Sequence, residues 1–306
     1  MTRAIYHGGC ERVTSLELVP SLTIRDAYEC RRDKFDPWEP LWITLVMPLH
    51  LVRSLYIIDG DTPLHLACRN HYIPTEIITT LLKYYCKPNE KNNEGDTPLH
   101  LACSNNMIHT RNPRIITMLL KNNCKPNEKN NEGDTPLHLA CRNFHTNSEI
   151  ITTLLENNCK PNEQNKEGKT VLHIAASVPN VNPKIIQALL EYGCFPKEKD
   201  GKGRTALHVA VDKDNVDLNT VKMLLENGCK NEKDLEGRTA LHVAVGRIKE
   251  DSNIVTTLLE IGFNPNEKDT MGNTPYMILK ARDSKEGKEQ RETAMKILKV
   301  EYLFML

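Results

Sequence analysis

Residues 95–103 read Gly-Asp-Thr-Pro-Leu-His-Leu-Ala-Cys, and this frame returns along the chain. A glycine stands two residues before each copy of its threonine, and the successive copies are 35, 38, 35, 35, 34 and 35 residues apart. The threonines are Thr62, Thr97, Thr135, Thr170, Thr205, Thr239 and Thr274. Such a period is typical of stacked supersecondary units, each of which buries its apolar face against the next. The segments 86–103 and 124–141 are identical, which indicates an internal duplication.

Each unit contains the signals for two helices. Gly133 permits the positive φ of a tight turn, Thr135 can cap a helix, and Pro136 suits the first helical position. A second apolar stretch follows at helical spacing, and in this unit it comprises Ile150, Ile151, Leu154 and Leu155. We therefore expect a short inner helix, a longer outer helix and an extended loop that leads to the next glycine.

These motifs closely resemble those of the ankyrin-repeat family, whose signature is Gly-x-Thr-Pro-Leu-His-Leu-Ala followed by an Ile/Leu-rich helix. The resemblance covers about residues 57–300. It implies an all-α solenoid of about seven stacked helix-turn-helix units with short β-turn fingers. The chain departs from the family pattern in a longer linker between the two helices and in lacking the Gly-His that ends the inner helix.

Two segments lie outside the predicted repeat domain of residues 57–300. For residues 1–56 we expect a degenerate or truncated capping repeat, in which Trp38 and Trp42 cover the first unit, with a distinct targeting or docking element as the alternative. Residues 301–306 form an apolar C-terminal tail. The seventh unit has Tyr276-Met277 in place of Leu-His and a charged second helix, so we expect it to cap the stack.

Composition argues against several classes of partner. The 40 basic residues balance the 40 acidic ones, which gives no global field to attract nucleic acid or an anionic membrane. The most apolar stretch, residues 41–58, contains Pro48, His50 and Arg53 and is shorter than a bilayer span requires. We see no export signal, and we predict no nucleic-acid partner, no membrane insertion and a monomer.

The recurrent histidines and cysteines could suggest a metal or catalytic site, but the repeat itself explains them better. The histidines are His65, His100, His138, His173, His208 and His242. Equivalent positions lie roughly 8–10 Å apart in stacked helices, too far to share one metal ion. In the family each imidazole hydrogen-bonds within its loop and ties consecutive turns together, and we expect the same here. The loop asparagines Asn89, Asn127, Asn162 and Asn266 are expected to have a structural turn role.

Ten cysteines without a Cys-x-x-Cys pair are interpreted as small buried residues copied with the repeat. Unpaired thiols favour a reducing compartment, so we expect the protein in the cytoplasm or the nucleus. We find no phosphate loop, nucleophile elbow or kinase motif, and we predict no metal, no cofactor and no enzymatic activity.

Family members bind partners through turn tips and the exposed side of the inner helices. The row between turn glycine and capping threonine switches from acidic to basic, which predicts a bipolar rim. The candidate contacts in this row are Asp61, Asp96, Asp134, Lys169, Arg204 and Arg238. A second row past the inner helices comprises Arg69, Ser104, Arg142, Ser177, Asp212 and Arg247.

We therefore predict a non-catalytic scaffold, adaptor or inhibitor that binds another protein through its concave face and turn tips. The alternative is a regulatory ankyrin segment of a larger enzyme or channel whose catalytic part is absent from this chain.

Overall fold

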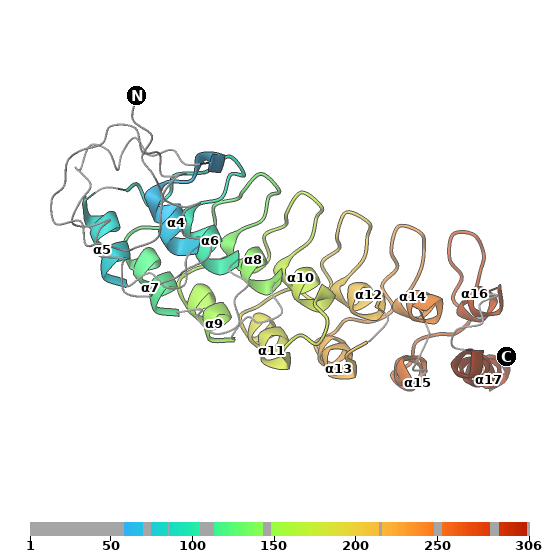
Figure 1. The fold of residues 1–306 in the computed structure, drawn as a ribbon. Coiled ribbons are helices and arrows are strands. Elements are labelled where there is room, and N and C mark those ends of the chain that lie inside the picture. Colours follow the sequence, from blue (N-terminus) through green and yellow to red (C-terminus); the bar gives the residue numbers. More distant parts are fainter. Residues whose placement is uncertain are drawn as a thin grey trace, which may run out of the picture.

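The computed structural model describes residues 58–69, 75–84, 86–104, 113–142, 148–213, 216–247, 253–281 and 288–304. The expectations for residues 1–56, including Trp38 and Trp42, lie outside the described residues. The described part is a stack of helix pairs (Figure 1).

Seven inner helices form one row of the stack, and seven outer helices form a second row. The inner helices are α4 (Pro63–Arg69), α6 (Pro98–Ser104), α8 (Pro136–Arg142), α10 (Val171–Ser177), α12 (Ala206–Val211), α14 (Ala240–Arg247) and α16 (Pro275–Ala281). The outer helices are α5 (Thr75–Tyr84), α7 (Pro113–Lys121), α9 (Ser148–Glu156), α11 (Pro183–Glu191), α13 (Leu218–Glu226), α15 (Asn253–Glu260) and α17 (Lys288–Phe304). A short 3-10 helix, η1 (Ile58–Gly60), precedes α4. The seven-unit helical solenoid expected from the sequence is thus confirmed.

Long loops, which we call fingers, lead from each outer helix to the next inner helix and project on one side of the stack (Figure 1). Every finger turns at a glycine with positive φ, for example Gly133 at 77°. A Cβ atom at Gly133 would lie 2.8 Å from the backbone nitrogen of Lys166 on the next finger. Glycine is therefore required both by the turn and by the close approach of neighbouring fingers.

The helix ends follow the predicted signals. Pro63, Pro98 and Pro136 take the first helical position, and Thr170 and Thr205 are the N-caps of α10 and α12. On the outer row, Asn182 caps α11 by accepting a hydrogen bond from the backbone N–H of Lys184. The five outer helices from α7 to α15 are each followed by a residue with positive φ at an equivalent position, which is Asn or Gly because these residues tolerate the left-handed conformation. The residues at this position are Asn123, Asn158, Gly193, Gly228 and Gly262.

The core consists of equivalent leucines and β-branched residues in thin layers. The second residue of each of the first six inner helices is a fully buried leucine, and outer-helix Ile and Val residues belong to the same buried cluster. The leucines are Leu64, Leu99, Leu137, Leu172, Leu207 and Leu241. Each layer packs only against its neighbours, so the stability of the stack depends on every interface.

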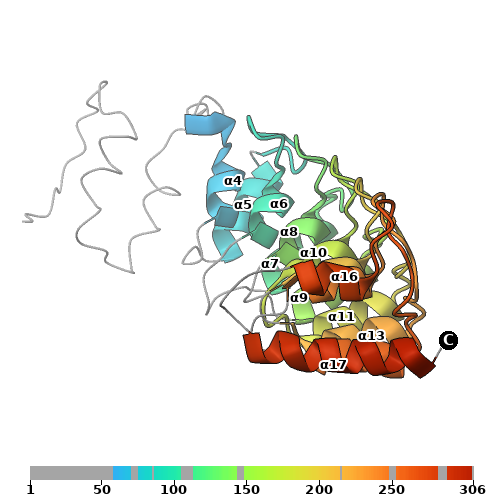
Figure 2. The ribbon, with the colours of Figure 1, turned by 90° about the vertical axis from the view of Figure 1, so that its right-hand side faces the viewer.

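The last unit closes the stack differently. Figure 2 looks along the stack from this end, with α17 running across the base. Tyr276 replaces the buried leucine and is only partly buried, while α17 contacts both α15 and α16. The helix continues through Phe304, so residues 301–304 of the apolar C-terminal segment are helical. Among the described residues no helix has the length and apolar character needed to cross a membrane.

Replacing Leu172 by Ala in the central layer should lower the free energy of unfolding by about 3 kcal/mol, because the cavity left between two helix layers cannot collapse. Leu235→Ala is the matched control, since Leu235 is 73% exposed and should change the free energy by under about 0.5 kcal/mol. Urea denaturation followed by circular dichroism measures both values. Equal effects of the two substitutions would contradict the layered core.

Candidate partner-binding face

A histidine relay holds each unit to the next. The Nδ1 atom of His173 accepts hydrogen bonds from the backbone N–H (3.2 Å) and the hydroxyl (2.8 Å) of Thr170. Nε2 therefore carries the proton and donates to the carbonyl of Arg204 on the next finger, at 2.8 Å. The same arrangement recurs at His65, His100, His138, His208 and His242. The expectation that each imidazole ties consecutive turns together is confirmed.

Burial lowers the pKa of all six imidazoles below the ordinary value of 6.5. The hydrogen bonds explain why the neutral ring is needed. A proton on Nδ1 would face the N–H of the capping threonine, so the charged ring cannot accept that bond.

Further ladders lock the fingers together. The backbone N–H of one fingertip donates to the carbonyl of the preceding one, as in Asn131 to Glu94 at 2.9 Å and Leu235 to Lys202 at 3.1 Å. At the finger bases, Asn127 donates to the carbonyl of Asn158 at 3.0 Å and accepts from the N–H of Lys160 at 2.7 Å. Asn89 and Asn162 repeat this bridge, which confirms their structural role. The Oδ1 atom of Asn266 is buried and accepts no hydrogen bond from the described residues.

The acidic half of the first predicted row does not form an exposed rim. Asp61, Asp96 and Asp134 are 0%, 5% and 0% exposed. Each carboxylate accepts a hydrogen bond from an asparagine on the following finger, at 2.8 Å in all three cases. The donors are Asn92, Asn130 and Asn165, in that order. A row of aspartates considered alone does not reveal this burial, because each is covered by a residue 31 or 34 positions later in the chain.

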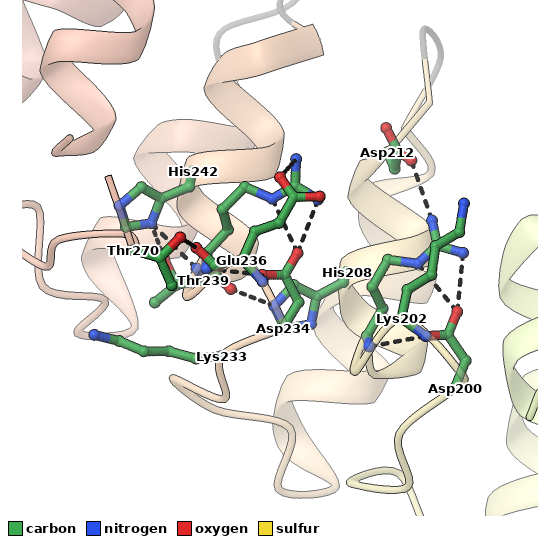
Figure 3. Close-up of polar contacts among 12 residues, drawn as sticks. Asp200, Lys202, His208, Asp212, Lys233, Asp234, Glu236, Thr239, His242 and Thr270 are labelled. Atoms are coloured by element: carbon green, nitrogen blue, oxygen red, sulfur yellow. Dashed lines mark hydrogen bonds and ion pairs between the residues drawn. The ribbon is translucent and has the colours of Figure 1, made fainter. Parts of the chain in front are cut away.

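The basic half of the row is held by carboxylates on its own finger. Arg204 donates to Asp200 through Nη2 at 2.9 Å, and Arg238 donates to Asp234 through Nε at 2.9 Å (Figure 3). Both aspartate side chains are 1% exposed, whereas the arginines are 16% and 34% exposed. Lys169 forms an ion pair with the exposed Glu167. Lys169, Arg204 and Arg238 thus reach the surface, while most of the opposing charge lies beneath it.

A signal for this arrangement exists in the sequence. Where the residue before the capping threonine is Asp, the facing residue of the next finger is Asn; where it is Lys or Arg, the facing residue is Asp. The facing residues are Asn92, Asn130, Asn165, Asp200, Asp234 and Asp269. Two aspartates never face each other, which avoids placing two carboxylates together in a buried site.

The second predicted row lies at the ends of the inner helices and is largely at the surface. The Arg69, Arg142 and Arg247 side chains are 50%, 53% and 53% exposed. Each contacts a less exposed carboxylate: Arg69 with Asp61 at 3.0 Å, Arg142 with Asp134 at 2.6 Å and Arg247 with Asp212 at 2.7 Å. The hydroxyls of Ser104 and Ser177 donate to carbonyls of their own helices. These side chains and the fingers together form what we call the inner face.

The thiols and imidazoles of the described residues show no metal-binding arrangement. Eight cysteines of the described residues have free thiols, and Cys10 and Cys30 are outside the described residues. Burial raises the pKa of Cys124, Cys159 and Cys194 to about 12. These thiols are therefore protonated and unreactive in the folded chain.

Comparison with known proteins agrees with this geometry. A family model described as ankyrin repeats (3 copies) matches residues 15–127, 107–200 and 178–269. The crystal structure of the ankyrin repeat domain of Bcl-3, described as a unique member of the IkappaB protein family, is similar to the chain with a TM-score of 0.58. The sequences are 28% identical, and the match covers 76% of this chain and 99% of the Bcl-3 chain. No functionally curated protein matches by sequence.

The free energy of unfolding should fall as the pH drops from about 7 to about 5. Because the folded-state pKa of each relay histidine lies below 6.5, the unfolded chain takes up protons first. The contribution of these histidines to the free energy of unfolding is therefore complete above their pKa in the unfolded chain. It is lost as the pH falls below that value, by up to about 1.4 kcal/mol per pH unit for each histidine. Chemical denaturation at fixed ionic strength measures this slope.

The glutamate carboxylates affect the free energy of unfolding in a separate, lower pH range. Hydrogen bonds from lysines lower the pKa of Glu128, Glu163 and Glu167, so their stabilisation is lost only below about pH 4.5. A free energy of unfolding that stays constant between about pH 7 and 5.5 would contradict a relay of neutral histidines.

Asn130→Asp should destabilise the stack by about 3 kcal/mol, because it places a second carboxylate against buried Asp96. Adding Asp96→Lys should recover most of the lost stability, because the two substitutions together reproduce the natural pair of Lys169 and Asp200. The units of Asp96 and Lys169 both end their inner helix with a serine. Urea denaturation of the single and double variants gives the coupling energy. Additive losses would show that the facing positions are independent.

Proposed function

Because the chain belongs to the ankyrin-repeat family, we propose that it is a non-catalytic scaffold, adaptor or inhibitor that binds another protein through its inner face. The observation that carries this proposal is the second row. Arg142 and Arg247 extend half-exposed from carboxylates that hold them in place, and stacking does not require their exposed atoms. Such side chains lose little freedom on binding, which favours recognition by a rigid surface.

The proposed contacts are the side chains of both rows that reach the surface. They are Lys169, Arg204 and Arg238 on the fingers and Arg69, Ser104, Arg142, Ser177, Asp212 and Arg247 on the inner helices. Asp61, Asp96 and Asp134 enter the proposal only as buried supports, because their carboxylates are covered.

The thiol chemistry supports a location in the cytoplasm or the nucleus, since seven buried and one partly buried free cysteines among the described residues suit a reducing compartment. The similarity to a member of the IkappaB family is consistent with this location.

An interaction assay with a matched pair of variants tests the inner face. The test variant carries Arg142→Ser and Ser177→Asp, which copy the residues found at equivalent positions in other units, Ser104 and Asp212. The control variant carries Lys222→Ser and Asn219→Glu on the exposed side of α13, with the same change in charge. We expect affinity for a captured partner to fall at least about tenfold in the test variant and to stay unchanged in the control.

Thermal unfolding of both variants confirms that each remains folded. Equal loss of affinity in the two variants would point to a general charge effect, and unchanged affinity in both would exclude this part of the inner face.

A further inference from the structure

The boundary between the fifth unit (α12 and α13) and the sixth unit (α14 and α15) lacks a bridge that joins earlier fingers. The bridging asparagines at the finger bases are Asn89, Asn127 and Asn162. In the finger that leads to α12 the equivalent residue is Lys197, which cannot accept a hydrogen bond from the backbone N–H of Lys230. The Cε atom of Lys197 would lie 3.8 Å from a Cβ atom at Gly228. The pair of hydrogen bonds that Asn127 makes therefore has no counterpart among the described residues of this boundary.

The finger that leads to α14 also differs from the finger before it. One residue fewer separates Cys229 from Thr239 than separates Cys194 from Thr205, and Pro196 has no counterpart in the shorter finger. The thiol of Cys229 donates to the carbonyl of Pro196 at 2.9 Å, but a thiol is a weak donor. The finger bases are thus joined more weakly here than at the earlier boundaries.

The outer helices separate at the same boundary. Among neighbouring outer helices of the described residues, α13 and α15 pack least closely against each other, and Figure 1 shows them set apart. The following boundary is covered in a different way, because the 17-residue helix α17 contacts both α15 and α16. The outer row is therefore loosest between the fifth and sixth units.

The finger side of this boundary keeps its contacts. The Nε2 atom of His208 donates to the carbonyl of Arg238 at 3.0 Å, and Lys199 donates to a carbonyl of the next finger at 2.7 Å. On the inner face, the Nε atom of Arg247 donates to Asp212 at 2.7 Å, which joins the ends of α14 and α12. The two units are thus held along their fingers and inner helices and are loosely joined along the outer row.

We infer that this boundary is a hinge, with its axis along the inner helices and fingers, and that the missing asparagine bridge is what frees it. Hinges form where little packing has to be broken while other contacts keep the two bodies together. The exposed side of the inner helices faces away from the outer row, so moving α15 away from α13 bends the stack toward the inner face. The bend closes the inner face around a partner, and this consequence rests on the proposed function, whereas the hinge itself needs no partner.

Pulsed electron double resonance on the full chain tests the hinge. One pair of spin labels is placed at Lys222 of α13 and Thr256 of α15, and a reference pair at Thr152 of α9 and Gln187 of α11. The labels are attached through a ketone-bearing amino acid, because the chain has 10 cysteines. We expect the distance distribution across α13 and α15 to be at least about twofold broader than that of the reference pair. Equal widths would overturn the hinge.

Lys197→Asn supplies the amide that Asn127 and Asn162 provide at earlier boundaries, so it should narrow the distribution between α13 and α15 toward that of the reference pair. Lys230→Asn is the matched control, because it removes the same charge from the adjoining finger without supplying that amide. The control should leave the width unchanged. No narrowing with Lys197→Asn, or equal narrowing in both variants, would also overturn the inference. The measurement contains no partner, so its outcome is independent of the interaction assay that tests the proposed function.

Discussion

The neutral imidazole between a capping threonine and the next finger is the interaction on which the stack depends. One buried ring satisfies the threonine N–H and hydroxyl and the carbonyl of the following unit. Each of these polar groups would cost about 1–3 kcal/mol if it were buried without a partner. The inner helices have only six to eight residues, too few to be stable alone, so they persist because neighbouring units complete their hydrogen bonds.

Most of the fold could be predicted because its signals are local. Glycine, threonine and proline at fixed spacing define where each inner helix begins, and the structure places Pro63, Pro98 and Pro136 at that position. The sequence does not define the end of α17, because an apolar run such as residues 301–304 can continue a helix as well as leave it. Helix ends carry weaker signals than helix starts when no glycine follows.

The candidate site was only partly predictable, because burial in a solenoid is decided between units. Asp134 resembles a surface charge when its own unit is considered, yet Asn165 and Arg142 cover it. Arg142 and Arg247 are the last residues of α8 and α14, and their side chains are half exposed. The exposure of Leu235 and Met271 could not be predicted from the repeat pattern, because an apolar residue in a loop carries no local signal that tells whether it is covered.

The facing pairs of the fingers also limit how such a chain can evolve. The units that carry aspartate before the capping threonine are followed by asparagine, and those that carry lysine or arginine are followed by aspartate. Copying a unit inside one block keeps every pair compatible, and the identical segments 86–103 and 124–141 lie within the first block. Moving a finger that carries Asp200 behind the unit of Asp134 would bring two buried carboxylates together. Gene duplication can therefore lengthen either block, but recombination across the boundary demands a simultaneous second substitution.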